Sequence, residues 1–339
     1  MALIEFTGSG IYCRQGDFYI DPWLPVKHAV ITHGHGDHAR TGMKNYLCHS
    51  HSAPVLRARL GEDINIQHLE YGESQFINGV KLSLHPAGHI FGSAQVRLEY
   101  LGKVVVISGD YKLEHDGIST PFELVKCHEF VTETTFGLPI YNWRPQDTLF
   151  GEMQNWIRRN REAGKTSVFI AYSLGKAQRL MKGLEGSGNL FVHFSINRLN
   201  KAIETTGTRI AAASVWDPEA DQKQLLGEIV ILPPSLLNTN IIKKIPSAAK
   251  AICSGWMQVR GSRRWQAVDA GFALSDHAGW KDLLYTVKGT AAEKIYVTHG
   301  FTSVFSRYLN ENGWSAEIVP THFGSDEESP SDQAQTALV

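Results

Sequence analysis

Residues 28–40 read HAVITHGHGDHAR, and this stretch decides how the rest of the chain is interpreted. The apolar run HAVIT is typical of a buried strand, and it leads directly into the spacing H-x-H-x-D-H at residues 33–38. Two imidazoles separated by one residue can converge on one cation, while the adjacent Asp37 and His38 turn toward a second. We expect a tight loop in which glycines let the backbone direct these side chains to one point. Zinc, manganese or iron would suit such ligands.

Three more candidate ligands stand just past apolar runs that predict strands. His89 follows VKLSLHPAG, Asp110 ends KVVVISGD, and His299 ends KIYVTHG. Residues beyond strand ends can gather along one edge of a sheet. Taken singly, a histidine at such a place is more often a structural residue, and an aspartate is commonly a turn former. Together with the loop at residues 33–38, they predict a centre for two metals.

The composition indicates a globular protein without a membrane span. With 339 residues, of which 42% are hydrophobic, the chain can bury a large core in two lobes or one large domain. It contains no run of 18 apolar residues and no pattern of a secretory signal, so we expect a cytoplasmic location. Its four cysteines form no CxxC pair, which predicts reduced thiols and a metal held by imidazole and carboxylate.

The pattern of predicted elements changes near Pro145. Before it, short apolar runs separated by Gly, Asn and Asp predict a largely antiparallel or mixed sheet. After it, DTLFGEMQNWIRRNREAG has helical spacing, with Asp147 as N-cap and Gly164 as stop, and strands then alternate with helices. The earlier pattern returns after Arg264. We therefore expect one domain interrupted by a second α/β domain, followed by a disordered tail at residues 321–339.

Two basic clusters stand out, one from Arg158 to Lys165 and one formed by Arg260, Arg263 and Arg264. Such clusters are most often solvated faces or loops. If the chain carries a nuclease centre, they could instead form an edge that binds a polyanion.

The candidate ligands, taken with Asp21, resemble the metallo-β-lactamase superfamily. The continuation resembles its β-CASP nucleic-acid-processing branch, because Glu133 in VTETTFG, His277 in FALSDHAGW and His299 in VTHG follow in order. The segments AYSLGKAQRL and SGWM also look like parts of the β-CASP insertion. The resemblance implies an α/β fold with an αββα sandwich formed by residues 1–145 and 266–320. A β-CASP α/β domain would be inserted at residues 146–265.

The resemblance also implies a role for each residue around two divalent transition metals, zinc or manganese. One metal would be held by His33, His35 and His89, and the other by Asp37, His38 and His299, with Asp110 bridging them. Asp21 would orient a ligand imidazole. The metals would activate a shared water for attack on a phosphodiester, with Asp37 counted among the catalytic residues. His277 would protonate the leaving oxygen or hold a phosphoryl oxygen, oriented by Glu133.

Two features bear on the substrate, and they disagree. His299 favours RNA, because Artemis-like DNA enzymes of this branch typically carry an apolar residue there. The compact chain, with FALSDHAGW and VTHGF in these forms, nevertheless looks most like the bacterial ligase-associated DNA exonucleases. That likeness implies an exonuclease in DNA repair, acting beside a DNA ligase and a helicase. We expect DNA, gripped by Arg260, Arg263 and Arg264, with RNA as the alternative substrate.

Two other classes of protein fit parts of the pattern. A small-molecule metallo-hydrolase would share the loop at residues 33–38, but it would need neither the insertion nor His277. An inactive scaffold subunit would be expected to have lost ligands, whereas every ligand position is filled here.

Overall fold

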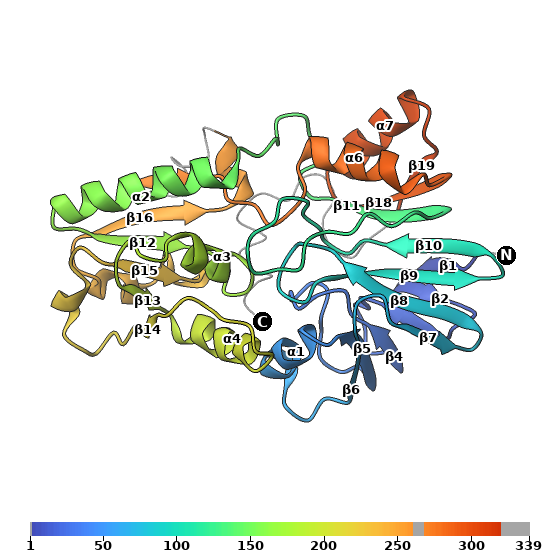
Figure 1. The fold of residues 1–339 in the computed structure, drawn as a ribbon, viewed down its shortest axis with the longest axis horizontal. Coiled ribbons are helices and arrows are strands. Elements are labelled where there is room, and N and C mark those ends of the chain that lie inside the picture. The colour runs from blue at the N-terminus through green and yellow to red at the C-terminus, as the bar shows by residue number, and fades with distance from the viewer. Residues whose placement is uncertain (1, 260–267, 320–339) are drawn as a thin grey trace.

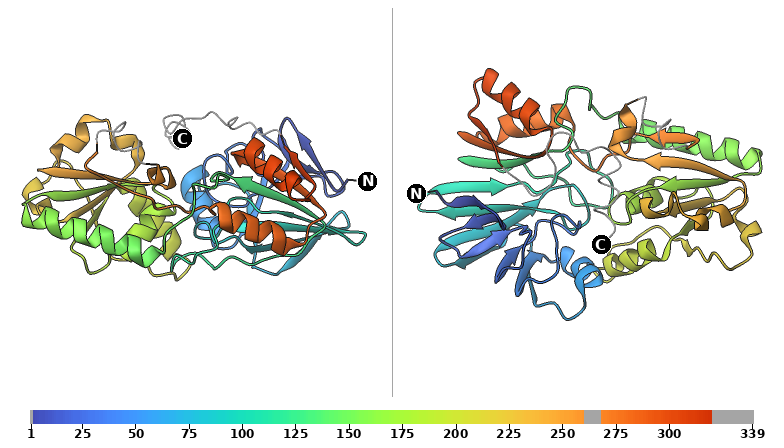
Figure 2. Two further views of the ribbon diagram at one scale, coloured as in Figure 1. Left: turned by 90° about the horizontal axis from the view of Figure 1, so that it is seen from above. Right: turned by 180° about the vertical axis from the view of Figure 1, so that it is seen from behind.

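The computed structural model describes residues 2–259 and 268–319, whose strands form three sheets. Two sheets stack face to face in one lobe, and the third lies in a second lobe beside them (Figure 1). The views from above and from behind show the same two lobes (Figure 2).

The first lobe is built from two mixed sheets. The strands of the first sheet follow chain order, antiparallel up to the third strand and parallel after it. They are β1 (Ile4–Thr7), β2 (Gly10–Cys13), β3 (Phe18–Ile20), β4 (His28–Val30), β5 (Asn45–His49) and β6 (Ile66–Leu69). The second sheet consists, in spatial order, of β19 (Ala316–Ile318), β18 (Lys294–Gly300), β11 (Glu129–Thr134), β10 (Lys103–Ile107), β9 (Ala94–Tyr100), β8 (Val80–Pro86) and β7 (Ser74–Ile77). The predicted mixed sheet is confirmed.

Alternation along the strands explains why these two sheets form a sandwich. In β10, Val105 and Ile107 belong to the core between the sheets, whereas Val106 belongs to the outer core of the second sheet. Successive side chains of a strand point to opposite faces, so both faces of this sheet must be covered. Helices α6 (Trp280–Thr290) and α7 (Thr302–Glu311) cover its outer face, and α1 (Ser52–Leu60) covers that of the first sheet. The lobe thus has the predicted αββα arrangement.

The third sheet is entirely parallel and forms the second lobe. All four residues of its central strand β15 are buried, as expected for a parallel sheet covered on both faces. One face is covered by α2 (Gln146–Glu162), α3 (Lys176–Gly183) and α4 (Phe194–Glu204). In spatial order the strands are β14 (Ser214–Val215), β13 (Leu190–Val192), β15 (Ile229–Leu232), β12 (Thr166–Ile170), β16 (Ala248–Cys253) and β17 (Ala270–Phe272).

The two lobes share an apolar core. The cluster beneath α2, α3 and α4 continues through Leu174 to Val55 and Ile90, which belong to the first lobe. The limits of an inserted domain at residues 146–265 remain a prediction, and β17 continues the third sheet beyond residue 265.

The start of α2 differs from the prediction, because Asp147 is not its N-cap. Pro145 occupies that position, and Asp147 lies in the first helical turn. The N–H of Gln146 instead donates to the carboxylate of Glu114 at 2.8 Å, so a distant side chain satisfies this end of the helix. The predicted stop is confirmed, since Gly164 follows the helix with a φ of +64°.

Two expectations from composition can be compared with the structure. None of the helices in the described part of the chain combines the length and the hydrophobicity needed to cross a membrane. All four cysteines are buried and carry free thiols, as predicted.

Candidate metal centre

The loop at residues 33–38 leaves the first sheet after β4 and turns back on itself. The N–H groups of His38 and Ala39 both donate to the carbonyl of His35, at 3.3 and 2.8 Å. Neither Gly34 nor Gly36 has a positive φ. Gly34 lies in close packing: an added Cβ would lie 3.1 Å from side-chain atoms of both Val55 and Leu174. The loop therefore depends on close packing, with one neighbour from each lobe.

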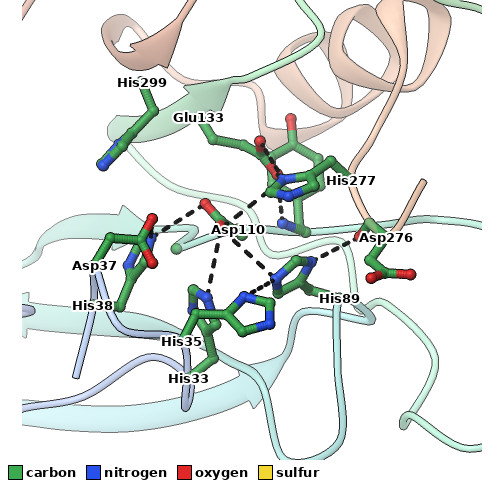
Figure 3. A network of polar contacts seen from close by, with 12 residues as sticks. His33, His35, Asp37, His38, His89, Asp110, Glu133, Asp276, His277 and His299 are labelled. Carbon is green, nitrogen blue, oxygen red and sulfur yellow. Dashed lines mark hydrogen bonds and ion pairs between the residues drawn. The ribbon is translucent and has the colours of Figure 1, made fainter. Parts of the chain in front are cut away.

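Asp110 lies at the centre of the predicted ligands (Figure 3). Its Oδ2 is 3.5 Å from Nε2 of His33 and 3.7 Å from Nε2 of His89, and its Oδ1 is 3.5 Å from Nε2 of His38. Among the described residues, three groups of ligand atoms share this carboxylate, and the atoms of each group lie within 4.8 Å of one another. Two groups contain the predicted metal ligands: His33, His35, His89 and Asp110, and Asp37, His38 and Asp110. The third consists of Asp110, Glu133 and His277.

Hydrogen bonds on the outer side of each imidazole determine which nitrogen faces the centre. Nδ1 of His38 donates to Asp21 at 2.7 Å, which leaves its Nε2 facing Asp110. Nδ1 of His33 lies 3.1 Å from the hydroxyl of Thr32, which itself donates to Asp21 at 2.6 Å. The hydroxyl therefore accepts from His33. Asp21 has the geometry expected of a residue that orients ligand imidazoles.

His35 and His89 are oriented by backbone carbonyls. Nε2 of His35 donates to the carbonyl of Leu174 at 3.2 Å, and Nδ1 of His89 donates to that of Asp276 at 2.8 Å. A carbonyl only accepts, so the proton of each neutral ring is on the outer nitrogen. The inner nitrogens, Nδ1 of His35 and Nε2 of His89, lie 3.0 Å apart. Two lone pairs at this distance require a positive charge between or beside them.

The electrostatics of the site fit a bound cation. Burial lowers the pKa values of His33 and His89 well below the ordinary histidine value, so both imidazoles are neutral and can act as ligands. Burial alone would lower the pKa of His38 too, but the carboxylates around it outweigh burial and raise that pKa well above its ordinary value. The buried Nε2 atoms of His33 and His38 have no hydrogen-bond partner. Neutral ligands, unpaired nitrogens and converging carboxylates are a donor set suited to zinc or manganese.

His299 lies near the centre but outside the two groups. Its ring stacks on that of His38 with centroids 5.3 Å apart, and its Nδ1 pairs with the hydroxyl of Thr298 at 2.9 Å. Figure 3 shows its side chain directed toward Asp37 and His38. The predicted role of His299 as a ligand stays a prediction.

Glu133 and His277 form a pair beside Asp110. Nδ1 of His277 is 2.9 Å from one oxygen of Glu133 and 3.9 Å from Oδ2 of Asp110. Glu133 is also fixed by the N–H of Tyr111, which donates to it at 2.8 Å. Burial alone would lower the pKa of His277, but the carboxylates of Glu133 and Asp110 raise it above its ordinary value. The side chain of His277 is 16% exposed and that of Asp37 is 36% exposed, so both can be reached from solvent.

Of the two basic clusters, the one from Arg158 to Lys165 falls within the described residues, and its hydrogen bonds lie in the second lobe. Arg260, Arg263 and Arg264 lie outside the described residues. In the other cluster, Arg161 donates to the carbonyls of Gly227 and Ser187, which ties α2 to its own lobe. Sequence reasoning missed the carbonyls of Leu174 and Asp276 altogether. The only signal for them was the position of both residues within segments that resemble β-CASP motifs.

Comparison with known proteins gives relatives that are larger than this chain. No family model matches the sequence. A probable DNA ligase of Opitutus terrae is 31% identical over 315 residues, which cover 91% of this chain but 30% of the ligase. An RNase J-like protein of Methanocaldococcus jannaschii is 25% identical over 182 residues, covering 46% of this chain and 42% of that protein. The matched regions thus span less than half the length of either relative.

Solved structures support the fold. A protein of unknown function from Enterococcus faecalis V583 superimposes with a TM-score of 0.59 at 12% identity, over 88% of this chain and 80% of that one. Its similarity concerns the fold alone. The αββα sandwich, the two ligand groups around Asp110 and the relatives together lead to one conclusion: this chain belongs to the β-CASP branch of the metallo-β-lactamase superfamily.

Proposed function

We propose that this protein is a metal-dependent phosphodiesterase that hydrolyses DNA from an end. The observation that carries the proposal is the position of Asp110, which faces both ligand groups and also the Glu133–His277 pair. Hydrolysis of a phosphodiester needs an activated water, charge to neutralise the phosphate, and a proton for the leaving oxygen. The residues around Asp110 offer groups for all three.

Two divalent transition metals, zinc or manganese, would supply a water of lowered pKa and positive charge for the phosphate. His33, His35 and His89 would hold one metal, and Asp37, His38 and His299 the other, with Asp110 shared. Asp21, Thr32 and the two carbonyls accept a proton on the outer side of His38, His33, His35 and His89, so in the neutral form of each ring the inner nitrogen carries the lone pair.

The Glu133–His277 pair would manage the proton of the leaving group. Glu133 accepts from Nδ1 of His277, so Nε2 is the atom that can carry a proton toward the substrate. The same carboxylate stabilises the charged ring, which keeps that proton available near neutral pH. Asp37 and His277 are both partly open to solvent, and the scissile phosphate would sit between them.

DNA is the substrate we favour. The similarity to a protein named as a probable DNA ligase supports it, as does the resemblance to ligase-associated exonucleases. A role in DNA repair in the cytoplasm, beside a DNA ligase and a helicase, is part of this proposal. RNA is the second candidate, because the chain keeps His299 and is similar to an RNase J-like protein.

One experiment separates these possibilities. Protein loaded with zinc or manganese is incubated with end-labelled DNA and RNA of one sequence, with free ends and with both ends blocked. We expect DNA with a free end to be shortened progressively, and blocked DNA to survive. Faster cleavage of RNA would replace DNA by RNA as the substrate. If the metal-loaded protein hydrolyses neither DNA nor RNA, the nuclease proposal is overturned.

A further inference from the structure

A buried ion-pair network joins α3 of the second lobe to the loop that carries His277. Nζ of Lys176 lies 2.9 Å from Oδ2 of Asp276, and the two side chains are 4% and 2% exposed. Arg179, one turn further along α3, lies 3.5 Å from the other oxygen of Asp276 and donates to the carbonyl of Ser275. A buried carboxylate is stable only when it is paired in this way. Asp276 is therefore held in place by α3.

The residues in this network also provide the carbonyls that orient two candidate ligands. The carbonyl of Asp276 itself accepts the proton of His89 Nδ1 (Figure 3). The carbonyl of Leu174, two residues before Lys176, accepts the proton of His35 Nε2. The outer hydrogen bonds of both histidines thus come from the two segments that the ion pair holds together.

Close packing fixes the same contact. Gly175, at the N-cap of α3, has a φ of +87°. A Cβ there would lie 2.4 Å from Cγ2 of Ile90 and 3.3 Å from Oδ2 of Asp276. Ile90 directly follows the ligand His89, so the start of α3 rests against the ligand loop with no space for a side chain.

We propose that Lys176 and Arg179 are positioning residues of the metal centre. By holding Asp276 against α3, they keep two carbonyls in place, and these carbonyls direct Nδ1 of His35 and Nε2 of His89 toward one metal. The metal site of the first lobe is then complete only while the second lobe is docked on it. This inference rests on the proposed metal ligands, but not on the identity of the substrate.

Burial argues against a direct role of Lys176 in holding the substrate. Its ammonium group already has a carboxylate partner, and it lies 4.9 Å from the ring centroid of Tyr172. A phosphate could reach this ammonium only if the ion pair opened. Replacement of Lys176 should therefore affect metal binding more strongly than substrate binding.

The test measures metal affinity, with no substrate present. Full-length wild type and Lys176→Met are titrated with Zn²⁺ against a chromophoric chelator, and Co²⁺ is used to record the visible spectrum of the site. We expect Lys176→Met to keep its far-UV circular dichroism but to bind its metal about 10–100-fold more weakly, the usual effect of losing an outer hydrogen-bond partner. The Co²⁺ spectrum should change as well.

Lys182→Met is the matched control, because it makes the same substitution on the same helix. The amine of Lys182 lies 3.9 Å from Glu185 at the surface, away from Asp276, so this variant should bind metal like wild type. A cycle with Asp276→Asn tests the coupling: if both residues act through one contact, the double variant loses no more affinity than the worse single variant. Additive losses would contradict the proposal.

Each outcome then has a meaning. A folded Lys176→Met with wild-type metal affinity overturns the positioning role. If Lys176→Met fails to fold, the double variant, which removes both charges, decides in its place by the same criterion. If the wild-type protein binds no metal, the proposal of a metal centre fails instead, so the two failures are distinguishable.

Discussion

Asp110 is the residue on which the candidate metal centre depends most. One of its oxygens faces His33, His89 and His277, and the other faces His38. No other side chain in the described part of the chain belongs to all three groups of converging ligand atoms. Any change at Asp110 should therefore affect metal binding on both sides and the proton donor together.

We predict that Asp110→Ala and His33→Ala abolish hydrolysis while the protein stays folded. The catalytic water would lose the charge that activates it, and no neighbouring side chain could supply that charge. Metal content, circular dichroism and hydrolysis of end-labelled DNA are measured on the same samples. An active wild-type preparation that contains no transition metal and resists chelators would contradict the metal centre.

Replacement of His277 and of His299 should have different effects. His277→Ala should keep its metals but lose turnover by about 10²–10⁴-fold, because a general acid is missing. His299→Ala should weaken binding of one metal. A substrate with a better leaving group, which needs little protonation, should partly rescue the first variant only. Loss of metal in His277→Ala, or equal rescue of both variants, would show that the two roles are assigned wrongly.

At the scale of elements, the site is a set of loops at strand ends that contact one another directly. The loop after β8 and the loop after β10 meet where the N–H of Lys112 donates to the carbonyl of Ala87 at 3.0 Å. Gly88 lies at this contact with a φ of +72°, and a Cβ there would come 2.2 Å from the carbonyl oxygen of Lys112. Because His89 and Asp110 stand on these two loops, their separation depends on that glycine.

We predict that Gly88→Ala lowers both stability and metal affinity. Gly72→Ala is the control, since Gly72 has a similar φ of +78° but nothing within 4 Å of an added Cβ. Gly72→Ala should lower the free energy of unfolding by about 1–2 kcal/mol, because alanine is strained in a left-handed conformation. Gly88→Ala should cost more than this, because two backbones must also separate. Equal losses in urea unfolding, with unchanged metal binding, would contradict the argument.

The sequence predicted those parts of the site that depend on local pattern. Apolar runs identified the strands, and polar residues directly after them identified Asp110 and His89, because strand ends meet at one edge. It could not predict contacts between segments distant in the chain. The pairing of Lys176 with Asp276 and the capping of α2 by Glu114 depend on how the lobes meet. The role of Gly34 was missed for the same reason, since its neighbours Val55 and Leu174 belong to different lobes.

At the scale of the whole molecule, the candidate centre lies where the first lobe meets the second, because His35 and His89 donate to carbonyls of Leu174 and Asp276. Leu174 and Asp276 reach it from segments next to the third sheet, while the ligands come from the first lobe. A nucleic acid that reaches the candidate centre would therefore contact both lobes. Basic side chains of both lobes would be needed to neutralise its phosphates.

We predict that DNA binding weakens steeply with salt, and that neutralising Arg260, Arg263 and Arg264 reduces the slope. Each lost phosphate contact should lower the slope of log K against log salt by about 0.7–0.9. Exchange of Arg158, Arg159 and Lys165, which are all exposed on or near α2, is the charge-matched control and should change little. If the variant that lacks the charges of Arg260, Arg263 and Arg264 keeps the wild-type DNA affinity and salt slope, these three arginines do not contact DNA.

The pairing of β11 with β18 has a consequence for co-translational folding. These strands are neighbours in the second sheet, yet residues 135–293 separate them in the chain. Contacts across so long a segment form late, whereas the third sheet is made from strands of that intervening segment and can close earlier. β18 also carries His299 toward the centre. We therefore expect a nascent chain to complete its second lobe first and to assemble the candidate metal centre among the last parts of the molecule.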